Sequence, residues 1–365
     1  CLLNSVEHIM RGLSIFRLIR EDNMETRARN LLWNKSATAL VTVLAAAALL
    51  LGSVDALAQS KKIIKIGSVL PADHPATLGG DKLAEIANAR AGDAIEVRVF
   101  PSEQLGSERE MFEGIRLGSI EMGYIAGNVI QNAEPSAALP SLPYLFKGFK
   151  NAFNLEDGPV GKEISERVLK ATGARTLGFY VTGFRQVAAK RPLRSLADFK
   201  GLKIRTPESP LMVATFKLLG ANPTPMPFGE LYTAIQTNVV DAAESPPGVL
   251  NWGKMFEVAP YMMKTSHIYT SGHILINDKF WQGLAPNVRK VLQEATTEAQ
   301  NYQRKLVVEK SGKIIAELQS RAKHPVTVVS IDTVPLRDAT ASYYEQFAKQ
   351  IGGMDLINKA KAAAK

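Results

Sequence analysis

The chain has 365 residues, of which 46% are hydrophobic and 22% charged, and its mean hydropathy is -0.03. This composition is typical of a folded soluble protein and excludes a disordered chain or a protein with many membrane spans. The single cysteine, Cys1, excludes a disulfide framework and a cysteine-based metal centre. The net charge of +9 comes from 44 basic and 35 acidic residues that are interspersed, so we expect small anions and no nucleic acid as partners.

The first 58 residues have the pattern of a secretory signal. Basic residues follow Met24, an uncharged apolar run covers residues 37–51, and Ala56 and Ala58 place small side chains at the minus-three and minus-one positions. We therefore expect cleavage after Ala58, export to the periplasm, and residues 1–23 to lie upstream of the true start. A retained anchor is the alternative, although a membrane-spanning helix usually needs about 20 apolar residues.

The rest of the chain alternates between strand and helix patterns. A first set has strands at residues 63–69, 95–99 and 120–126 and helices at 78–88 and after Ser107, which can cap its helix together with Glu110. A second set has strands at 176–182 and 201–206 and helices at 162–171, 212–219 and 228–237. Such alternation predicts an α/β fold of two lobes, each a sheet covered by helices, with ligand crevices at the carboxyl ends of parallel strands.

A long helix is predicted after Pro286. Apolar residues recur at helical spacing from Val288 to Leu306, and no proline occurs between residues 287 and 324. A helix of 25 residues would cover roughly 38 Å, enough to brace two small lobes. The alternative is two ordinary helices broken near Ser311 and Gly312.

No catalytic constellation is recognisable. The chain lacks the nucleophile elbow, the phosphate-binding loop, the paired-histidine zinc motif and the dinucleotide-binding glycine motif. His267 and His273 lack further metal ligands nearby, so we interpret them as hydrogen-bonded structural histidines. For Asp241 and Glu244 we expect a structural role in which they accept backbone N–H bonds.

Two arginines lie at the ends of predicted strands. Arg185 follows the strand at 176–182, and Arg205 ends the strand at 201–206 before Pro207. Two guanidinium groups that converge on a crevice would suit a carboxylate, because each presents a planar pair of donors. The alternative for each arginine is a surface ion pair.

Six separated motifs agree in order and spacing with one family. They are LPADHP at 70–75, FPSEQLGSEREMFEGIRLGSIEMG at 100–123, LPYLF at 142–146, GFRQ at 183–186, GLKIRTPESP at 201–210 and GANPTPMPFGELYTAIQTNVVDAAES at 220–245. Over residues 62–355 the chain resembles the extracytoplasmic solute-binding subunit of TRAP transporters, the DctP family.

The resemblance implies a periplasmic binding protein fold of two lobes with mixed sheets, joined by hinge strands and braced by a long helix. Residues 59–182 and about 271–310 would form the first lobe, and residues 183–270 and about 311–365 the second. The implied partners are a small carboxylate ligand and a sodium-driven permease with a small and a large membrane subunit.

The resemblance assigns the family's ligand-binding positions to individual residues of this chain. By this resemblance Arg205 forms the salt bridge to the ligand carboxylate, Arg185 contacts the carboxylate from a second position, Glu208 lines the site and Phe228 forms part of the wall. Many members carry asparagine where this chain has Ser245, so a ligand contact there can be lost or pass to water.

The first lobe contributes His74 and Asn128 to the expected site. No cofactor is implied. A metal is not expected either, because the branch of the family that bridges its ligand through a metal carries tryptophan at the position of Ser245.

The ligand's class follows in part from Glu208. Its carboxylate would repel a second carboxylate but could accept hydrogen bonds from hydroxyls, which favours a hydroxylated monocarboxylate such as a sugar acid over succinate or malate. Two other functions stay open: a periplasmic enzyme acting on an acidic sugar, and a ligand-binding subunit that serves a sensor.

Overall fold

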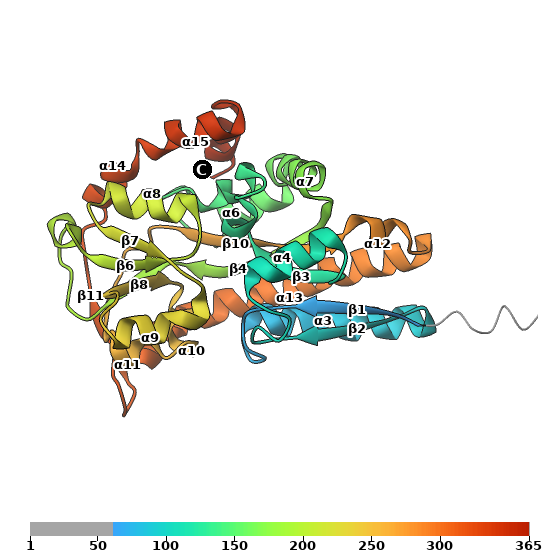
Figure 1. The fold of residues 1–365 in the computed structure, drawn as a ribbon, viewed down its shortest axis with the longest axis horizontal. Coiled ribbons are helices and arrows are strands. Elements are labelled where there is room, and N and C mark those ends of the chain that lie inside the picture. Colours follow the sequence, from blue (N-terminus) through green and yellow to red (C-terminus); the bar gives the residue numbers. More distant parts are fainter. Residues whose placement is uncertain (1–60, 365) are drawn as a thin grey trace, which may run out of the picture. The chain divides into compact units, whose positions relative to one another are not determined.

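The computed structural model describes residues 61–364, which fold around two mixed β-sheets covered by helices (Figure 1). The predicted cleavage after Ala58 lies outside the described residues and stays a prediction. We call the part around the first sheet lobe I and the part around the second sheet lobe II.

The sheet of lobe I has five strands in the order β2-β1-β3-β10-β4. Strand β1 pairs in parallel with β2 and β3, and β10 pairs antiparallel with β3 and β4. The strands are β1 Lys62–Gly67, β2 Ile95–Phe100, β3 Met122–Ala126, β4 Ala174–Phe184 and β10 Tyr269–Asn277. The strand predictions in this lobe are confirmed to within a few residues at each end.

Helix α4 of lobe I begins where its capping residues predicted. The Ser107 hydroxyl accepts from the Glu110 amide, the Glu110 carboxylate accepts from the Ser107 amide, and Gly118 ends the helix with a φ of 81°. The helices of this lobe are α3 Pro75–Ala91, α4 Glu108–Leu117, α5 Gly127–Ile130, α6 Phe149–Asp157, α7 Pro159–Thr172 and α12 Asp278–Gln282, with 3-10 turns η2 Gly92–Ala94 and η3 Pro135–Ser141.

The sheet of lobe II has six strands in the order β11-β9-β5-β8-β6-β7. Its strands are β5 Gln186–Ala189, β6 Lys203–Thr206, β7 Asn222–Pro225, β8 Ala242–Ser245, β9 Tyr261–Met263 and β11 Thr327–Val329. Its helices are α8 Pro210–Leu218, α9 Leu231–Gln236, α10 Pro247–Trp252 and α11 Met255–Val258, with 3-10 turns η4 Leu196–Phe199 and η5 Phe228–Glu230. The helix expected at 228–237 therefore starts as the 3-10 turn η5.

Strands β4 and β5 form a direct connection between the lobes. Strand β4 of the first sheet ends at Phe184, and β5 of the second sheet starts at Gln186, so Arg185 lies at the crossing. The chain returns from β9 through residues 264–268 into β10. Because both crossings lie side by side, joined by the hydrogen bond from the Arg185 amide to the Ile268 carbonyl at 2.8 Å, they form a hinge.

The long helix is confirmed as a single element. Helix α13, Pro286–Gln319, continues for 34 residues, about 51 Å, without a break at Ser311 and Gly312, so the two-helix alternative is wrong. It contacts α3 and β4 of lobe I and α10 and β11 of lobe II. Figure 1 shows it crossing from one sheet to the other.

The C-terminal helices depart from the expected division of the chain. They are α14 Val334–Thr340, α15 Tyr343–Ile351 and α16 Asp355–Ala363. Helix α14 contacts α8 of lobe II, whereas α15 contacts η3 and α16 contacts α6 and α7 of lobe I. We expected residues 311–365 in lobe II, but the apolar side chains of Tyr343, Phe347 and Ile357 are buried in the same core as Ile164 of α7.

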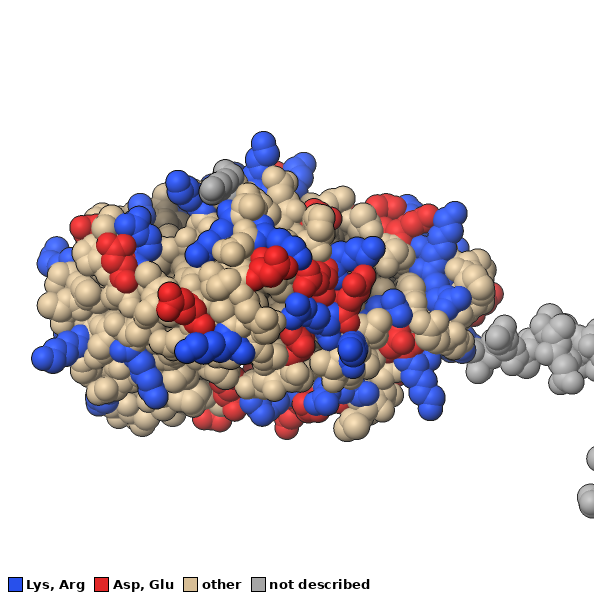
Figure 2. Space-filling view, turned by 90° about the horizontal axis from the view of Figure 1, so that it is seen from above, with Lys and Arg blue, Asp and Glu red and all other residues tan. Residues whose placement is uncertain are grey.

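The surface carries charges of both signs. On the face seen in Figure 2, basic and acidic side chains are interspersed and do not gather into one basic patch. Within residues 61–364, the helices are all too short or too polar to cross a membrane.

Candidate functional site

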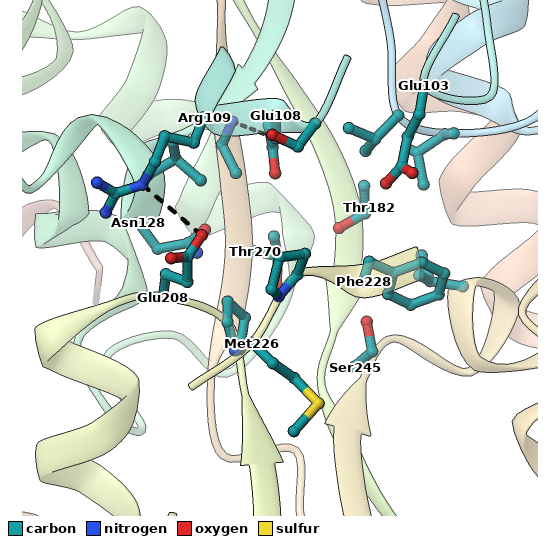
Figure 3. A pocket seen from close by; sticks show the side chains of 18 of the residues that line it. Glu103, Glu108, Arg109, Asn128, Thr182, Glu208, Met226, Phe228, Ser245 and Thr270 are labelled. Carbon is teal, nitrogen blue, oxygen red and sulfur yellow. Dashed lines mark hydrogen bonds and ion pairs between the residues drawn. The ribbon is translucent and has the colours of Figure 1, made fainter. Parts of the chain in front are cut away.

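A cavity lies between the two lobes beside the hinge (Figure 3). Its volume is about 110 Å³, which is small compared with the roughly 300 to 1,000 Å³ of sites for drug-sized molecules. Six of the seven residues expected at the ligand site line it: Arg185, Arg205, Glu208, Phe228, Ser245 and Asn128. The seventh, His74, does not.

Arg205 is held in place by the backbone of its own lobe. It occupies the third position of β6, and Pro207 follows that strand directly. Its Nε and Nη2 atoms donate to the Met226 carbonyl at 3.0 and 2.7 Å, and its guanidinium carbon lies 5.8 Å from the centre of the Phe228 ring. These contacts leave Nη1 without a hydrogen-bond partner within residues 61–364, and Arg205 lines the cavity.

The charge of Arg205 has no direct partner. The side chain is only 3% exposed and makes no ion pair with any residue between 61 and 364. Burial lowers the pKa of its guanidinium to about 10, which still leaves it cationic at neutral pH. Because an unpaired buried charge is costly, this arrangement favours an anion in the cavity.

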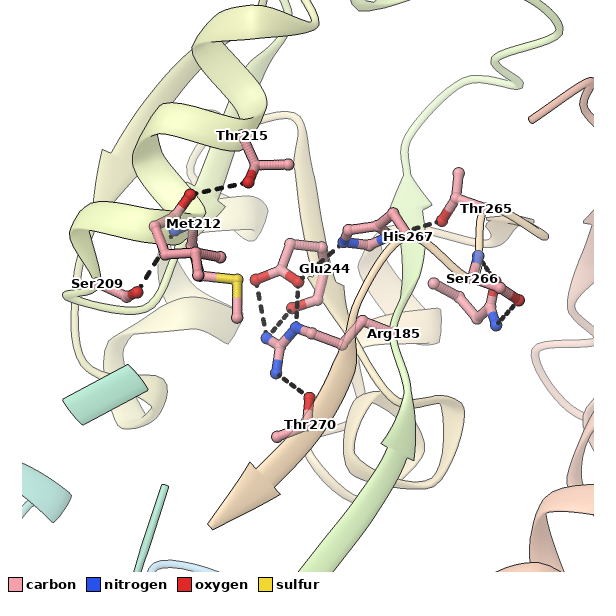
Figure 4. Close-up of polar contacts among 11 residues, drawn as sticks. Arg185, Ser209, Met212, Thr215, Glu244, Thr265, Ser266, His267 and Thr270 are labelled. Carbon is pink, nitrogen blue, oxygen red and sulfur yellow. Dashed lines mark hydrogen bonds and ion pairs between the residues drawn. The ribbon is translucent and has the colours of Figure 1, made fainter. Parts of the chain in front are cut away.

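Arg185 is, by contrast, already paired (Figure 4). Its Nη2 donates to Oε1 and to the carbonyl of Glu244, each at 2.8 Å, its Nε donates to Oε2 of Glu244, and its Nη1 donates to the Thr270 hydroxyl at 3.1 Å. Both Arg185 and Glu244 are buried. The attraction that Arg185 offers a ligand is therefore largely offset by Glu244.

Glu244 has a second partner in His267. The His267 Nε2 lies 3.3 Å from Oε2 of Glu244, and its Nδ1 lies 2.8 Å from the Thr265 hydroxyl. Burial alone would raise the pKa of the Glu244 carboxyl, but Arg185 and His267 together hold it below its usual range. We expected Glu244 to accept backbone N–H bonds; it accepts side-chain bonds instead, because the hinge brings Arg185 against it.

Glu208 lies at the mouth of the cavity, after the end of β6. Its Oε2 is 3.6 Å from Nε of Arg109 on α4, so this ion pair joins the two lobes across the cleft. Both side chains are well exposed, and such a pair contributes little to stability. Glu208 can therefore exchange Arg109 for a ligand group at little cost.

Two further carboxyl groups line the cavity and escaped the sequence analysis. Glu108 starts α4, where its Oε1 accepts the Ala126 amide at 2.7 Å, and Glu103 lies before the same helix. Burial raises the pKa of both, that of Glu108 to about 7. The signal was present, since both lie in the family-like motif at 100–123, but only Ser107 and Glu110 were interpreted there, as a helix cap.

The raised pKa of Glu108 predicts a pH effect on stability. A carboxyl that binds its proton more tightly in the folded state makes the free energy of unfolding fall as pH rises from about 4.3 toward 7. Glu108→Gln cannot ionise and lacks this loss. Between pH 5 and 7.5 the free energy of unfolding should therefore fall by about 1 to 2 kcal/mol less in Glu108→Gln than in the wild type. This figure is reduced for solvent screening, because the side chain is partly exposed. Urea denaturation across this pH range measures the difference.

The control for this experiment is Glu113→Gln. Glu113 is an exposed carboxylate on the same helix, outside the cavity. Its pH profile should follow the wild type. Parallel profiles for wild type and Glu108→Gln would contradict the assignment of a raised pKa to Glu108.

Asn128 and Ser245 offer polar groups to the cavity from opposite lobes. Asn128 lies in α5 and is 3% exposed, and Ser245 ends β8 and is 4% exposed. Neither side chain makes a hydrogen bond to another residue within the described part of the chain, and both line the cavity in Figure 3. An amide and a hydroxyl are thus available to a ligand or to water.

His74 has a different place from the one expected. Its Nδ1 accepts the Ala76 amide at 3.1 Å, so it caps the N-terminus of α3. Its side chain borders a second cavity, described below, which the hinge separates from the first. Pro75, which follows it directly, occupies the first turn of this helix.

His267 and His273 have hydrogen-bond partners, as predicted. His273 Nδ1 lies 2.9 Å from the Thr176 hydroxyl, and His267 bonds Thr265 and Glu244. Among residues 61–364, no group of three or more histidine, aspartate or glutamate side chains could hold a metal ion.

Comparison with known families gives one match over most of the chain. Residues 66–350 match the model of DctP, described as bacterial extracellular solute-binding protein, family 7. The 2,3-diketo-L-gulonate-binding periplasmic protein YiaO of Escherichia coli (strain K12) is 34% identical over 283 residues, which are 77% of this chain and 85% of YiaO.

Solved structures agree with this match. A TRAP periplasmic solute binding protein from Xanthobacter autotrophicus Py2 with bound β-D-galacturonate is 30% identical, with a TM-score of 0.78 over 82% of this chain and 99% of that one. Another from Haemophilus influenzae RdAW, with bound L-gulonate, is 26% identical, with a TM-score of 0.79 over 83% of this chain and 100% of that one.

Proposed function

The chain belongs to family 7 of the bacterial extracellular solute-binding proteins (DctP), and we propose that its ligand is a hydroxylated monocarboxylate such as a sugar acid. It is a solute-binding protein with the two-lobed α/β fold of the TRAP periplasmic proteins.

The observation that carries the proposal is the uneven charge of the cavity. Lobe II contributes the guanidinium of Arg205, which has no ion pair within residues 61–364, and the carboxylate of Glu208, whereas lobe I contributes the carboxyl groups of Glu103 and Glu108. A single ligand carboxylate would pair with Arg205, whereas a second one would meet these acidic groups. Ligand hydroxyls, in contrast, can donate to each of the three carboxyls.

The ligands of the related proteins support this class. β-D-galacturonate, L-gulonate and 2,3-diketo-L-gulonate each carry one carboxylate on a short carbon chain or ring that also bears hydroxyls. A molecule of this type would use both sides of the cavity at once. Ser245 and Asn128 would then offer further hydrogen bonds from the two lobes.

The capture of the acid would be the first step of transport. The lobes would close on the ligand around the hinge at Arg185, and the protein would deliver it unchanged to a TRAP permease with a small and a large membrane subunit, driven by sodium. Capture would take place in the periplasm after removal of residues 1–58. The proposed role is binding without chemical conversion of the acid.

Calorimetric titration against a panel of matched compounds tests the ligand class. We expect D-galacturonate, D-galactonate or L-gulonate to bind, and the bound acid at 100 times its Kd should stabilise the fold by about 2.7 kcal/mol. D-galactose, which lacks the carboxylate, should bind at least 100-fold more weakly. Succinate and malate, which add a second carboxylate, should also bind weakly.

Two outcomes would contradict the proposal in different ways. Tightest binding of succinate or malate would overturn the monocarboxylate class but keep Arg205 as the anchor. Equal binding of galactose and galacturonate would show that the carboxylate is not recognised at all.

A further inference from the structure

A second cavity of about 500 Å³ lies on the other face of the hinge. Lobe I contributes Phe149 to it, lobe II contributes Gln186 and Trp252, and the middle of α13 contributes Val307 and Lys310. It is larger than the first cavity, and both lobes and the bracing helix line it. Its occupant would therefore contact both lobes and helix α13, whose relative positions would change when the lobes close.

The hinge strand separates the two cavities. Along the crossing from β4 to β5, Arg185 lines the first cavity, whereas its neighbours Phe184 and Gln186 line the second. This is the alternation that an extended backbone imposes on successive side chains. A change in the hinge therefore alters both cavities together.

An aromatic contact also connects the cavities. Phe228 lines the first cavity beside Arg205, and Trp252 lines the second. Their rings are stacked, with centroids 5.6 Å apart and planes 10° from parallel. A molecule that packs on Trp252 would thus restrict the position of Phe228, whose ring lies beside the guanidinium of Arg205.

Most of the second cavity is apolar, and its polar lining includes the donor His74, the cation Lys310 and two exposed carboxylates, Asp73 and Glu317. Phe149 and Phe184 lie edge to face at 5.2 Å, and prolines and isoleucines complete the apolar wall. The wall also includes Lys310, whose Nζ donates to the Asp73 carbonyl at 3.3 Å and keeps further N–H groups for a ligand.

His74 supplies the second donor. Its side chain is 8% exposed, and because Nδ1 accepts the Ala76 amide, the neutral ring carries its proton on Nε2. Burial, with Lys310 nearby, lowers the pKa of His74 to about 3, so the ring is neutral at physiological pH. Nε2 has no hydrogen-bond partner within residues 61–364, and the cavity is where it can find one.

We propose that this second cavity binds a small amphipathic carboxylate, an apolar ring with one anionic group, and that its occupancy strengthens acid binding in the first cavity. The ring would pack on Trp252 and the phenylalanines, and the carboxylate would accept from His74 Nε2 and Lys310 Nζ.

The expected sign of the coupling follows from the lobe arrangement. Both cavities are present in the same relative position of the two lobes. In this position the Ser209 hydroxyl of lobe II donates to Gln131 of lobe I at 3.0 Å, and Arg109 pairs with Glu208 across the cleft. A molecule that contacts both lobes in this arrangement favours it over more open ones. Acid binding in the first cavity then requires less reorganisation, and the effect is reciprocal.

The binding test uses 2-naphthoate as the probe, titrated calorimetrically into the wild type and a cavity-filling variant. Gly248 lines the cavity, and a Cβ there meets no atom within 4 Å, so Gly248→Phe adds a ring at this wall and Gly248→Ala is the matched control. We expect saturable binding to the wild type and Gly248→Ala, at least 10-fold weaker binding to Lys310→Gln, and none to Gly248→Phe. Equal binding to Gly248→Phe, or no saturable binding to the wild type, would overturn the site.

Because 2-naphthoate is itself a carboxylate, it could also bind the first cavity. A pair of variants distinguishes binding at the two cavities. Arg205→Ala should lose the sugar acid and keep 2-naphthoate, whereas Gly248→Phe should do the reverse. Loss of 2-naphthoate in Arg205→Ala would place the probe in the first cavity and overturn the proposal. Only the sugar-acid part of this test rests on the proposed function. Binding of 2-naphthoate to the second cavity can therefore be judged even if no sugar acid binds the first.

The coupling is measured as a change in affinity. With 2-naphthoate at saturation, the Kd of the sugar acid should fall at least 3-fold in the wild type and not at all in Gly248→Phe. In Trp281→Phe, Trp252 is the only tryptophan after residue 58, so its fluorescence should change with either ligand. An unchanged Kd in the wild type would overturn the coupling.

Discussion

Arg205→Ala should weaken binding of the acid ligand by at least 100-fold. The guanidinium is 3% exposed, has no ion pair in the described part of the chain and faces the cavity. Removing one partner of a desolvated charge pair costs about 3 to 5 kcal/mol, and each 1.4 kcal/mol is tenfold in affinity. Calorimetric titration of the identified acid measures the loss, after circular dichroism has shown that the variant is folded.

Two companion variants separate a geometric clamp from a general positive field. Arg205→Lys keeps the charge but not the planar fork, so it should also bind poorly. Arg109→Gln removes an exposed cation at the mouth of the same cavity and should change the affinity only a few-fold. Near-native affinity in folded Arg205→Ala would show that the carboxylate is held elsewhere.

Glu244→Ala should lower the free energy of unfolding by about 3 to 5 kcal/mol. The carboxylate is fully buried and is the counter-ion of Arg185, which is itself 5% exposed and would be left buried without its ion pair. His267 would lose a partner at the same time. Urea denaturation at pH 7 measures the change.

Two controls test whether the buried pair is the cause. The double variant with Arg185→Met and Glu244→Leu removes both charges and should regain more than half of the lost stability. Asp241→Ala breaks a partly exposed contact with Lys203 at 3.9 Å and should cost less than about 1 kcal/mol. A loss below 1 kcal/mol in Glu244→Ala would mean that Arg185 finds another partner.

Local patterns were enough to predict several elements of this fold. The alternation of Ile95, Val97 and Val99 marks β2, and the pair Ser107 and Glu110 marks the start of α4. These signals depend on neighbours a few residues apart, where backbone geometry and side-chain spacing are directly related. The position of Arg205 at a strand end was predictable for the same reason.

The division of roles between the two arginines was not predictable. In the sequence, Arg185 and Arg205 look alike, since each follows or ends a strand and each matches a family motif. The structure distinguishes them because β5 and β8 pair antiparallel, which brings Glu244 to Arg185 across 59 residues of chain. No such partner reaches Arg205 within the described residues.

The sequence by itself thus determined the alternation of strands and helices, the family, and six of the residues that line the interlobe cavity. The tertiary structure decided which polar groups meet: it pairs Arg185 with Glu244, brings Glu108 and Arg205 to one cavity, and places His74 on the far side of the hinge. The reason is physical. Secondary structure follows from local periodicity, whereas the cost of a buried charge depends on groups that only the packing of the two lobes brings within a few ångströms.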